Sequence, residues 1–145
     1  MRHCKTGPFA LSKQEHLLAV HFIRNYTDTK YKYFDILHAS SSSSFDGTYC
    51  KTSIPGDPVG DTVAALEPYG KKITLIEDAA KWADKENWRY LIKSVEQDET
   101  REALIRQGLT LSKDKFYRAR QAFIWRVYTE LSDLLNNYTP QQPQQ

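Results

Sequence analysis

The residues of this chain best suited to chemistry are basic and aromatic side chains that cluster between positions 100 and 126. This segment carries seven basic and two acidic residues, a net charge of +5, whereas the remainder carries 13 basic and 16 acidic residues, a net charge of −3. Clustered lysines and arginines gain affinity for a polyanion by releasing its condensed counterions. The segment therefore predicts a DNA-binding surface, although charge alone more often marks the solvated face of a helix.

Four of these residues are expected to enter the major groove. Arg118 suits guanine and Gln121 suits adenine, because each side chain can form two hydrogen bonds with that base. Lys113 and Lys115 precede them on the same predicted helix and complete the set.

Four further residues are expected to hold the DNA backbone. Arg101, Arg106 and Arg120 suit phosphates, and Tyr117 can donate its hydroxyl to one. Arg120 also borders the predicted apolar stripe, so an intramolecular ion pair is the alternative for this side chain.

Two helices and a glycine-led turn are expected to position these side chains. Residues 100–107 predict a short helix that ends at Gly108, a residue that tolerates a positive φ angle. Ser112 is a suitable N-cap for the long helix that follows. This order is typical of a helix-turn-helix, whose second helix reads DNA. The apolar positions of that second helix recur at helical spacing: Phe116, Ala119, Phe123, Val127, Leu131 and Leu134.

The sequence lacks the spacings that catalysis or metal binding would need. It contains no G-x-S-x-G, no phosphate-binding glycine loop and no H-E-x-x-H. Cys4 and Cys50 lack the spacing of zinc ligands. No apolar run approaches the ~20 residues of a membrane span, and no signal peptide opens the chain. We therefore expect no enzyme activity, no metal, no cofactor and no membrane partner, in a cytoplasmic protein.

The N-terminal part predicts a loose arm over residues 1–11, followed by a helix that starts with the capping box at Ser12. Either one helix continues to about His38, or two helices meet near Thr27 and Thr29. A serine run then opens a stretch without periodicity, which predicts a flexible linker over residues 40–56.

The remaining elements are also helical. Asp57 and Pro58 predict a helix start, Pro68 is expected to kink or restart that helix, and Asp84 is expected to cap the next one. We therefore predict an all-α helical bundle with a C-terminal helix-turn-helix and a separate N-terminal helix. The expected parts are an N-terminal helical segment (1–39), the linker (40–56), the helix-turn-helix domain (57–138) and a disordered tail (139–145).

Aromatic and apolar side chains around the last helix predict more than one buried stripe. Trp82, Trp125 and Tyr128 are expected at a core edge or a contact surface, and Leu134 and Leu135 continue the apolar surface. Two explanations remain open: contact with a second subunit or another protein through this helix, or a thicker intramolecular core.

Three sequence blocks resemble the phage regulators of the ArpU and RinA type. They are D-P-V-G-D-T at 57–62, K-K-I-T-L-I-E-D-A at 71–79 and L-S-K-D-K-F-Y-R-A-R-Q-A-F at 111–123. The resemblance implies a helix-turn-helix similar to region 4 of sigma factors, with the last block as its recognition helix. It also implies sequence-specific binding to double-stranded DNA at late promoters in a bacterial host cell, with RNA polymerase as a further partner.

Two other functions fit the same pattern. One is a small terminase subunit, which recognises packaging DNA and assembles into rings. The other is a helical adaptor that binds only protein, such as RNA polymerase. The size of the assembly separates the first from a regulator, and the salt dependence of binding separates the second.

Overall fold

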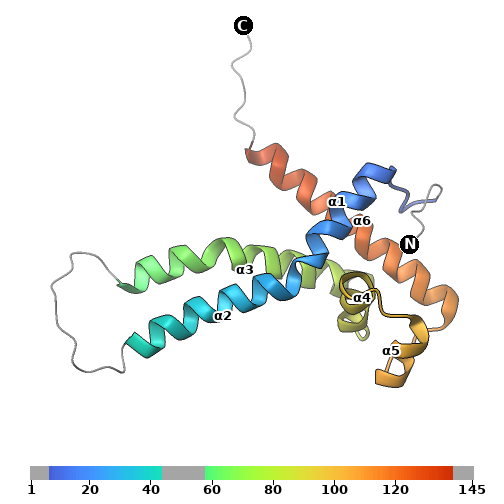
Figure 1. Ribbon diagram of the computed structural model, residues 1–145. Coiled ribbons are helices and arrows are strands. Elements are labelled where there is room, and N and C mark those ends of the chain that lie inside the picture. Colours follow the sequence, from blue (N-terminus) through green and yellow to red (C-terminus); the bar gives the residue numbers. More distant parts are fainter. Residues whose placement is uncertain (1–6, 44–57, 139–145) are drawn as a thin grey trace, which may run out of the picture. The chain divides into compact units, whose positions relative to one another are not determined.

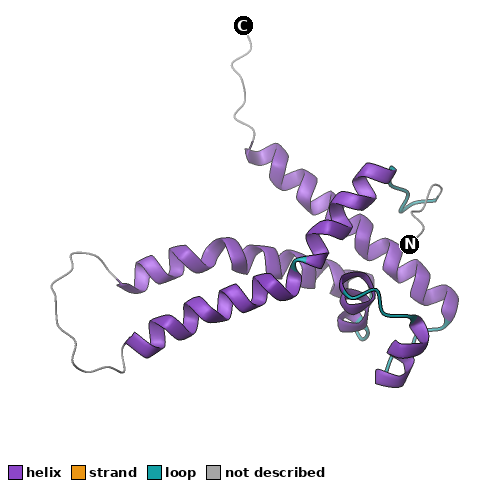
Figure 2. Ribbon diagram, viewed as in Figure 1, coloured by secondary structure: helices purple, strands orange, loops and turns teal. Residues whose placement is uncertain are grey.

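The computed structural model describes residues 7–43 and 58–138, and over these residues α-helix is the only regular secondary structure (Figures 1 and 2). The all-α prediction is therefore confirmed. The described helices are α1 (Lys13–Arg24), α2 (Tyr26–Ser43), α3 (Pro58–Ala83), α4 (Trp88–Glu96), α5 (Arg101–Gln107) and α6 (Lys113–Tyr138).

The helices belong to two compact units. The first contains α1, the part of α3 from Leu75 onward, α4, α5 and α6, and the second contains α2 and the part of α3 up to Thr74. These units divide the chain differently from the expected segments 1–39 and 57–138. The physical reason is that α1 packs against α4 and α6, so the first predicted segment divides at Asn25.

The start of α1 follows its sequence signature. The Ser12 hydroxyl accepts the Glu15 N–H at 3.2 Å, and the Glu15 carboxylate accepts the Ser12 N–H at 2.8 Å. This reciprocal pair is the predicted capping box. The helix α1 ends at Arg24, Asn25 is its C-cap, and α2 begins at Tyr26. The two-helix alternative is therefore confirmed, with the break slightly before the threonines.

Glu15 also connects α1 to α6, because the Tyr128 hydroxyl donates to its carboxylate. The backbone N–H of Ser12, this hydroxyl and the Ser12 side chain lower the pKa of Glu15. A lowered carboxyl pKa stabilises the fold above the unfolded-state value of about 4.3, and this contribution is lost as pH falls through the folded value.

We therefore predict that Glu15→Gln removes part of the acid dependence of the melting temperature. Glutamine keeps the acceptor of the capping box but does not titrate. Thermal melts of both proteins between pH 7 and pH 2 should differ most at neutral pH and converge in acid. A constant difference at every pH would contradict this role of the Glu15 charge.

The core of the first unit lies where α1, α4, α5 and α6 meet. The largest side chains of this unit with almost no exposure are Phe123, Ile23, Ile76, Leu91, Leu104, Ile124, Val95 and Val127. Ile124 and Val127 are buried within this unit, so an intramolecular core accounts for much of the broad apolar surface of α6. Leu134 and Leu135 near its end remain exposed.

The second unit is a pair of helices, α2 and the first part of α3. Tyr33 of α2 lies against Gly70 of α3, where an added Cβ would meet the ring at 3.5 Å. The helix α3 continues through Pro68, so of the two expected outcomes, a kink or a restart, the restart does not occur. Proline removes the N–H that would bond the Ala64 carbonyl, and both residues are exposed, so water can satisfy that carbonyl.

Some predictions fall wholly or partly outside the described residues. The predicted linker 40–56 starts too early, because α2 extends through Ser43, and its remaining residues are not described. Asp57, Cys4, Cys50 and the tail 139–145 also lie outside the described part.

Candidate nucleic-acid interface

The turn between α5 and α6 has the geometry that the sequence predicts. The Thr100 hydroxyl accepts the Ala103 N–H at the start of α5, and Gly108 ends this helix with φ 126°. A Cβ at Gly108 would lie 2.6 Å from the Tyr90 hydroxyl oxygen, which donates to the Gln107 carbonyl at 2.9 Å. The φ angle therefore favours glycine at this position, and any larger residue would also have to displace the Tyr90 hydroxyl from its hydrogen bond.

The helix α6 begins directly after this turn. The Ser112 carbonyl accepts the Phe116 N–H at 2.8 Å, as expected for the residue that precedes the helix. Phe116 and Phe123 lie on the buried side of α6, while another side of its first turns is exposed to solvent. The structure therefore contains the predicted short helix, turn and long helix.

A polar network joins the α5–α6 turn to the turn between α3 and α4. The sequence predicted that Asp84 would cap α4, but Asn87 holds the N-cap position. The Asp84 Oδ1 instead accepts the N–H groups of Glu86 and Asn87 and the Asn87 side-chain amide. The Asn87 amide donates to the Thr110 hydroxyl at 3.1 Å, and its oxygen accepts the Thr110 N–H at 3.1 Å. Asn87 is 3% exposed, so these bonds are shielded from water.

We predict that Asn87→Ala destabilises the protein by about 1–3 kcal/mol, because it leaves the Thr110 N–H and part of Asp84 without partners. Urea denaturation of the variant and of the wild type measures this difference. The exposed neighbour Glu86→Ala is the control, since only its backbone joins the network. Equal stability of the Asn87 variant and the wild type would show that the network is not needed.

Most of the predicted interface residues are exposed on α5 and on the first turns of α6. Arg106, Lys113, Lys115, Tyr117 and Arg118 are exposed, and Gln121 is half-buried. Within the described part of the chain, the four cations of this set have no hydrogen-bond or ion-pair partner. They form an unneutralised positive surface, which we call the α6 cationic face: Arg106, Lys113, Lys115 and Arg118.

Arg101 and Arg120 have intramolecular partners instead. One Arg101 terminal nitrogen donates to the Leu111 carbonyl at 3.2 Å, and its Nε is buried without a partner among the described residues. Arg120 donates to the Ser94 hydroxyl at 3.3 Å and the Ser94 carbonyl at 3.4 Å. Burial lowers the pKa of Arg120, and the charge of Asp98 opposes that shift. These partners favour structural roles over the phosphate contacts expected for both arginines.

An aromatic cluster beside α6 did not follow from the sequence. Phe9 packs against Trp82, with ring centroids 6.1 Å apart, and against Trp125 at 5.5 Å. The two tryptophan rings lie 5.9 Å apart, and the Arg126 guanidinium lies 5.1 Å from the Trp82 centroid. Phe9 belongs to the predicted loose arm, and only its aromatic type hinted that this arm packs.

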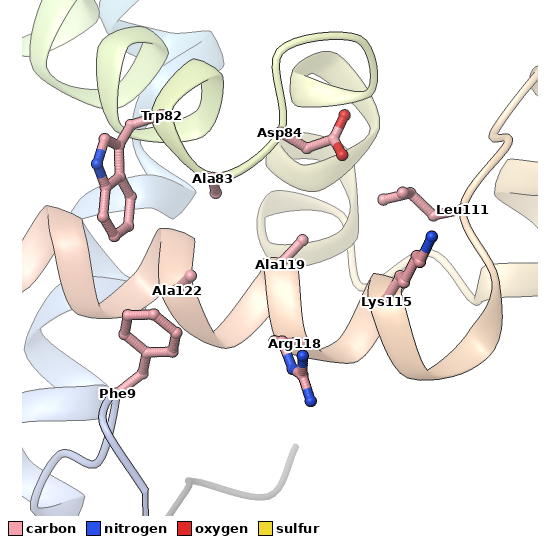
Figure 3. Close-up of a pocket in the computed structure, with 9 residues that line it drawn as sticks. All are labelled: Phe9, Trp82, Ala83, Asp84, Leu111, Lys115, Arg118, Ala119 and Ala122. Atoms are coloured by element: carbon pink, nitrogen blue, oxygen red, sulfur yellow. The ribbon is translucent and has the colours of Figure 1, made fainter.

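The cluster forms one end of a groove of about 370 Å³ along α6. Figure 3 shows Phe9 and Trp82 at one end, and Leu111 and Lys115 at the other. The α6 residues Ala119 and Ala122 lie between these ends, together with Arg118. Lys115 and Arg118 of the α6 cationic face thus also line this groove.

Among the described side chains, no group of three or more His, Cys, Asp or Glu is placed to hold a metal ion. No helix within 7–43 and 58–138 is both long enough and apolar enough to cross a bilayer.

Comparison with known proteins gives no match from which a function could be assigned. No protein-family model matches the chain, and no curated protein or solved structure shows significant similarity to it.

Proposed function

We propose that this protein is a sequence-specific DNA-binding transcriptional regulator that reads the major groove with the first turns of α6. The α6 cationic face carries the proposal, because four cations lie exposed and unneutralised by any described residue beside a short helix and a glycine turn. A helix presented in this way fits the major groove, which is about 12 Å wide.

The exposed side chains would have different roles. Arg118 would contact a guanine and Gln121 an adenine, and Lys113 and Lys115 would lie in the major groove with them. Arg106 and the Tyr117 hydroxyl would hold phosphates. Arg101 and Arg120 would act indirectly, by fixing the turn and α4 against α6.

We propose phage or prophage late promoters as the sites of this activity, and the resemblance of residues 57–62, 71–79 and 111–123 to the ArpU and RinA regulators supports this proposal. In that setting RNA polymerase is the further partner. The exposed Leu134 and Leu135 near the end of α6 support a homo-oligomer through this helix.

A selection from random-sequence DNA with the purified protein tests the proposal. We expect enrichment of a defined site, together with a monomer or dimer mass by light scattering. Recovery of no common sequence would contradict sequence-specific binding. A ring-sized assembly would instead favour a small terminase subunit.

We predict a steep salt dependence for the selected duplex. If the four cations of the α6 cationic face, in the groove and at the phosphates together, displace about four counterions, the slope of log K against log salt concentration is about −3.6, and affinity falls on the order of 100-fold between 50 and 200 mM salt. Fluorescence anisotropy at a series of salt concentrations measures the slope. A slope near zero would show that the α6 cationic face does not contact the DNA backbone.

Exposed apolar residues on the second unit favour protein binding as the alternative. Tyr31, Phe34 and Leu37 lie on α2 with exposures of 65%, 45% and 37%. A helical adaptor would use such a face, and its binding would be nearly insensitive to salt. A salt-insensitive complex with RNA polymerase, in the absence of DNA binding, would support this alternative.

A further inference from the structure

We propose that the groove along α6 binds a small aromatic anion, and that its occupancy withdraws Lys115 and Arg118 from DNA. The effect on DNA binding rests on the proposed function, whereas ligand binding in the groove does not. The volume of about 370 Å³ lies in the range of small-ligand sites, which are mostly apolar with a few converging polar groups.

One end of the groove suits a planar ring. Trp82 is 48% exposed, and its indole is held in place by Trp125, Phe9 and the Arg126 guanidinium. Arg126 is itself fixed by Glu130 at 3.0 Å. An aromatic surface that is already ordered loses little entropy when a second ring packs against it.

Small side chains on α6 leave room for such a ring in the groove. Ala119 and Ala122 are the α6 residues between the two ends, and a methyl group is the smallest side chain that still offers an apolar contact (Figure 3). Larger residues at these two positions would fill the space between Trp82 and Lys115.

The α6 side of the groove supplies positive charge, from Lys115 at the end near Leu111 and from Arg118 between the two ends. Lys115 and Arg118 both line the groove, and neither has a hydrogen-bond or ion-pair partner among the described residues. Asp84 also lines it, but its Oδ1 is occupied by three N–H donors of its own turn. In Figure 3, Lys115 points towards Leu111 and Arg118 points away from Asp84. Two cations and one carboxylate leave the groove lining with a net positive charge, which favours an anionic group, either a phosphate or a carboxylate.

Calorimetric titration of the full chain tests this site without DNA. The probes are adenosine 5′-monophosphate and salicylate, which separate a phosphate from a carboxylate source, with adenosine and inorganic phosphate as controls. We expect saturable binding of at least one probe, at least tenfold tighter than either control. Lys115→Ala and Trp82→Ala should each weaken it at least tenfold, whereas Lys113→Ala, outside the groove, should change it less than twofold.

The proposed effect of groove occupancy on DNA binding is tested by measuring DNA affinity at a saturating concentration of that probe. The affinity of the wild type for the selected duplex should fall at least fivefold, and Trp82→Ala should keep its DNA affinity but lose this response. Absence of saturable binding by both probes, or equal binding by all variants, would overturn the groove proposal. Ligand binding without DNA binding would instead refute the proposed function and leave the groove site standing.

Discussion

Replacing Arg118 with alanine is expected to weaken binding to the selected duplex by ~1–3 kcal/mol, about 5- to 150-fold. The guanidinium is exposed on the first turns of α6 and has no partner among the described residues, so its whole donor set is available to a base. Fluorescence anisotropy with the wild type and the variant at one fixed salt concentration measures the loss.

Two control variants separate base reading from general electrostatics. Arg118→Lys keeps the charge but removes the planar pair of donors, so it should relax discrimination at one base pair while retaining most of the non-specific affinity. Lys72→Ala removes an exposed cation from the second unit and should change affinity little. If Arg118→Ala binds the selected and scrambled duplexes as the wild type does, Arg118 does not read DNA.

Replacing Phe123 with alanine is expected to lower the free energy of unfolding by about 3–5 kcal/mol. Phe123 is 0% exposed and lies on α6, the helix that packs against α1 and α4. The loss combines the missing apolar contact with the cavity left in a core that relaxes only partly. Urea denaturation monitored by circular dichroism measures it.

The matched control is Ile105→Ala, which removes an apolar side chain that is 42% exposed on α5. Its effect should stay within about 0.5–1 kcal/mol. Where the Phe123 variant is still folded, its DNA affinity should equal that of the wild type, because the side chain does not reach the interface. A loss of stability below 1 kcal/mol would show that the α6 core is not packed as described.

The features that the sequence predicted well depend on local chemistry. The capping box at Ser12 and Glu15 and the glycine stop at Gly108 are each set by residues within four positions. The exposed part of the interface also followed from helical periodicity, since Lys113 and Arg118 lie away from the buried stripe.

The features that the sequence missed depend on residues far apart in the chain. Asn87 bonds Thr110 across 23 positions, and Arg120 bonds Ser94 across 26. Charge alone could not separate Arg120 from Arg118, because burial by α4 distinguishes them and burial is a tertiary property. The packing of Phe9 against Trp82 and Trp125 escaped prediction for the same reason.

Backbone amide shifts of the labelled protein, recorded by nuclear magnetic resonance during titration with the selected duplex, test whether α6 recognises DNA. We expect the largest shift changes to fall on residues 106–121, to saturate with the duplex, and to shrink with a scrambled duplex of equal length. Shift changes confined to the second unit, or equal changes with both duplexes, would contradict recognition of DNA by α6.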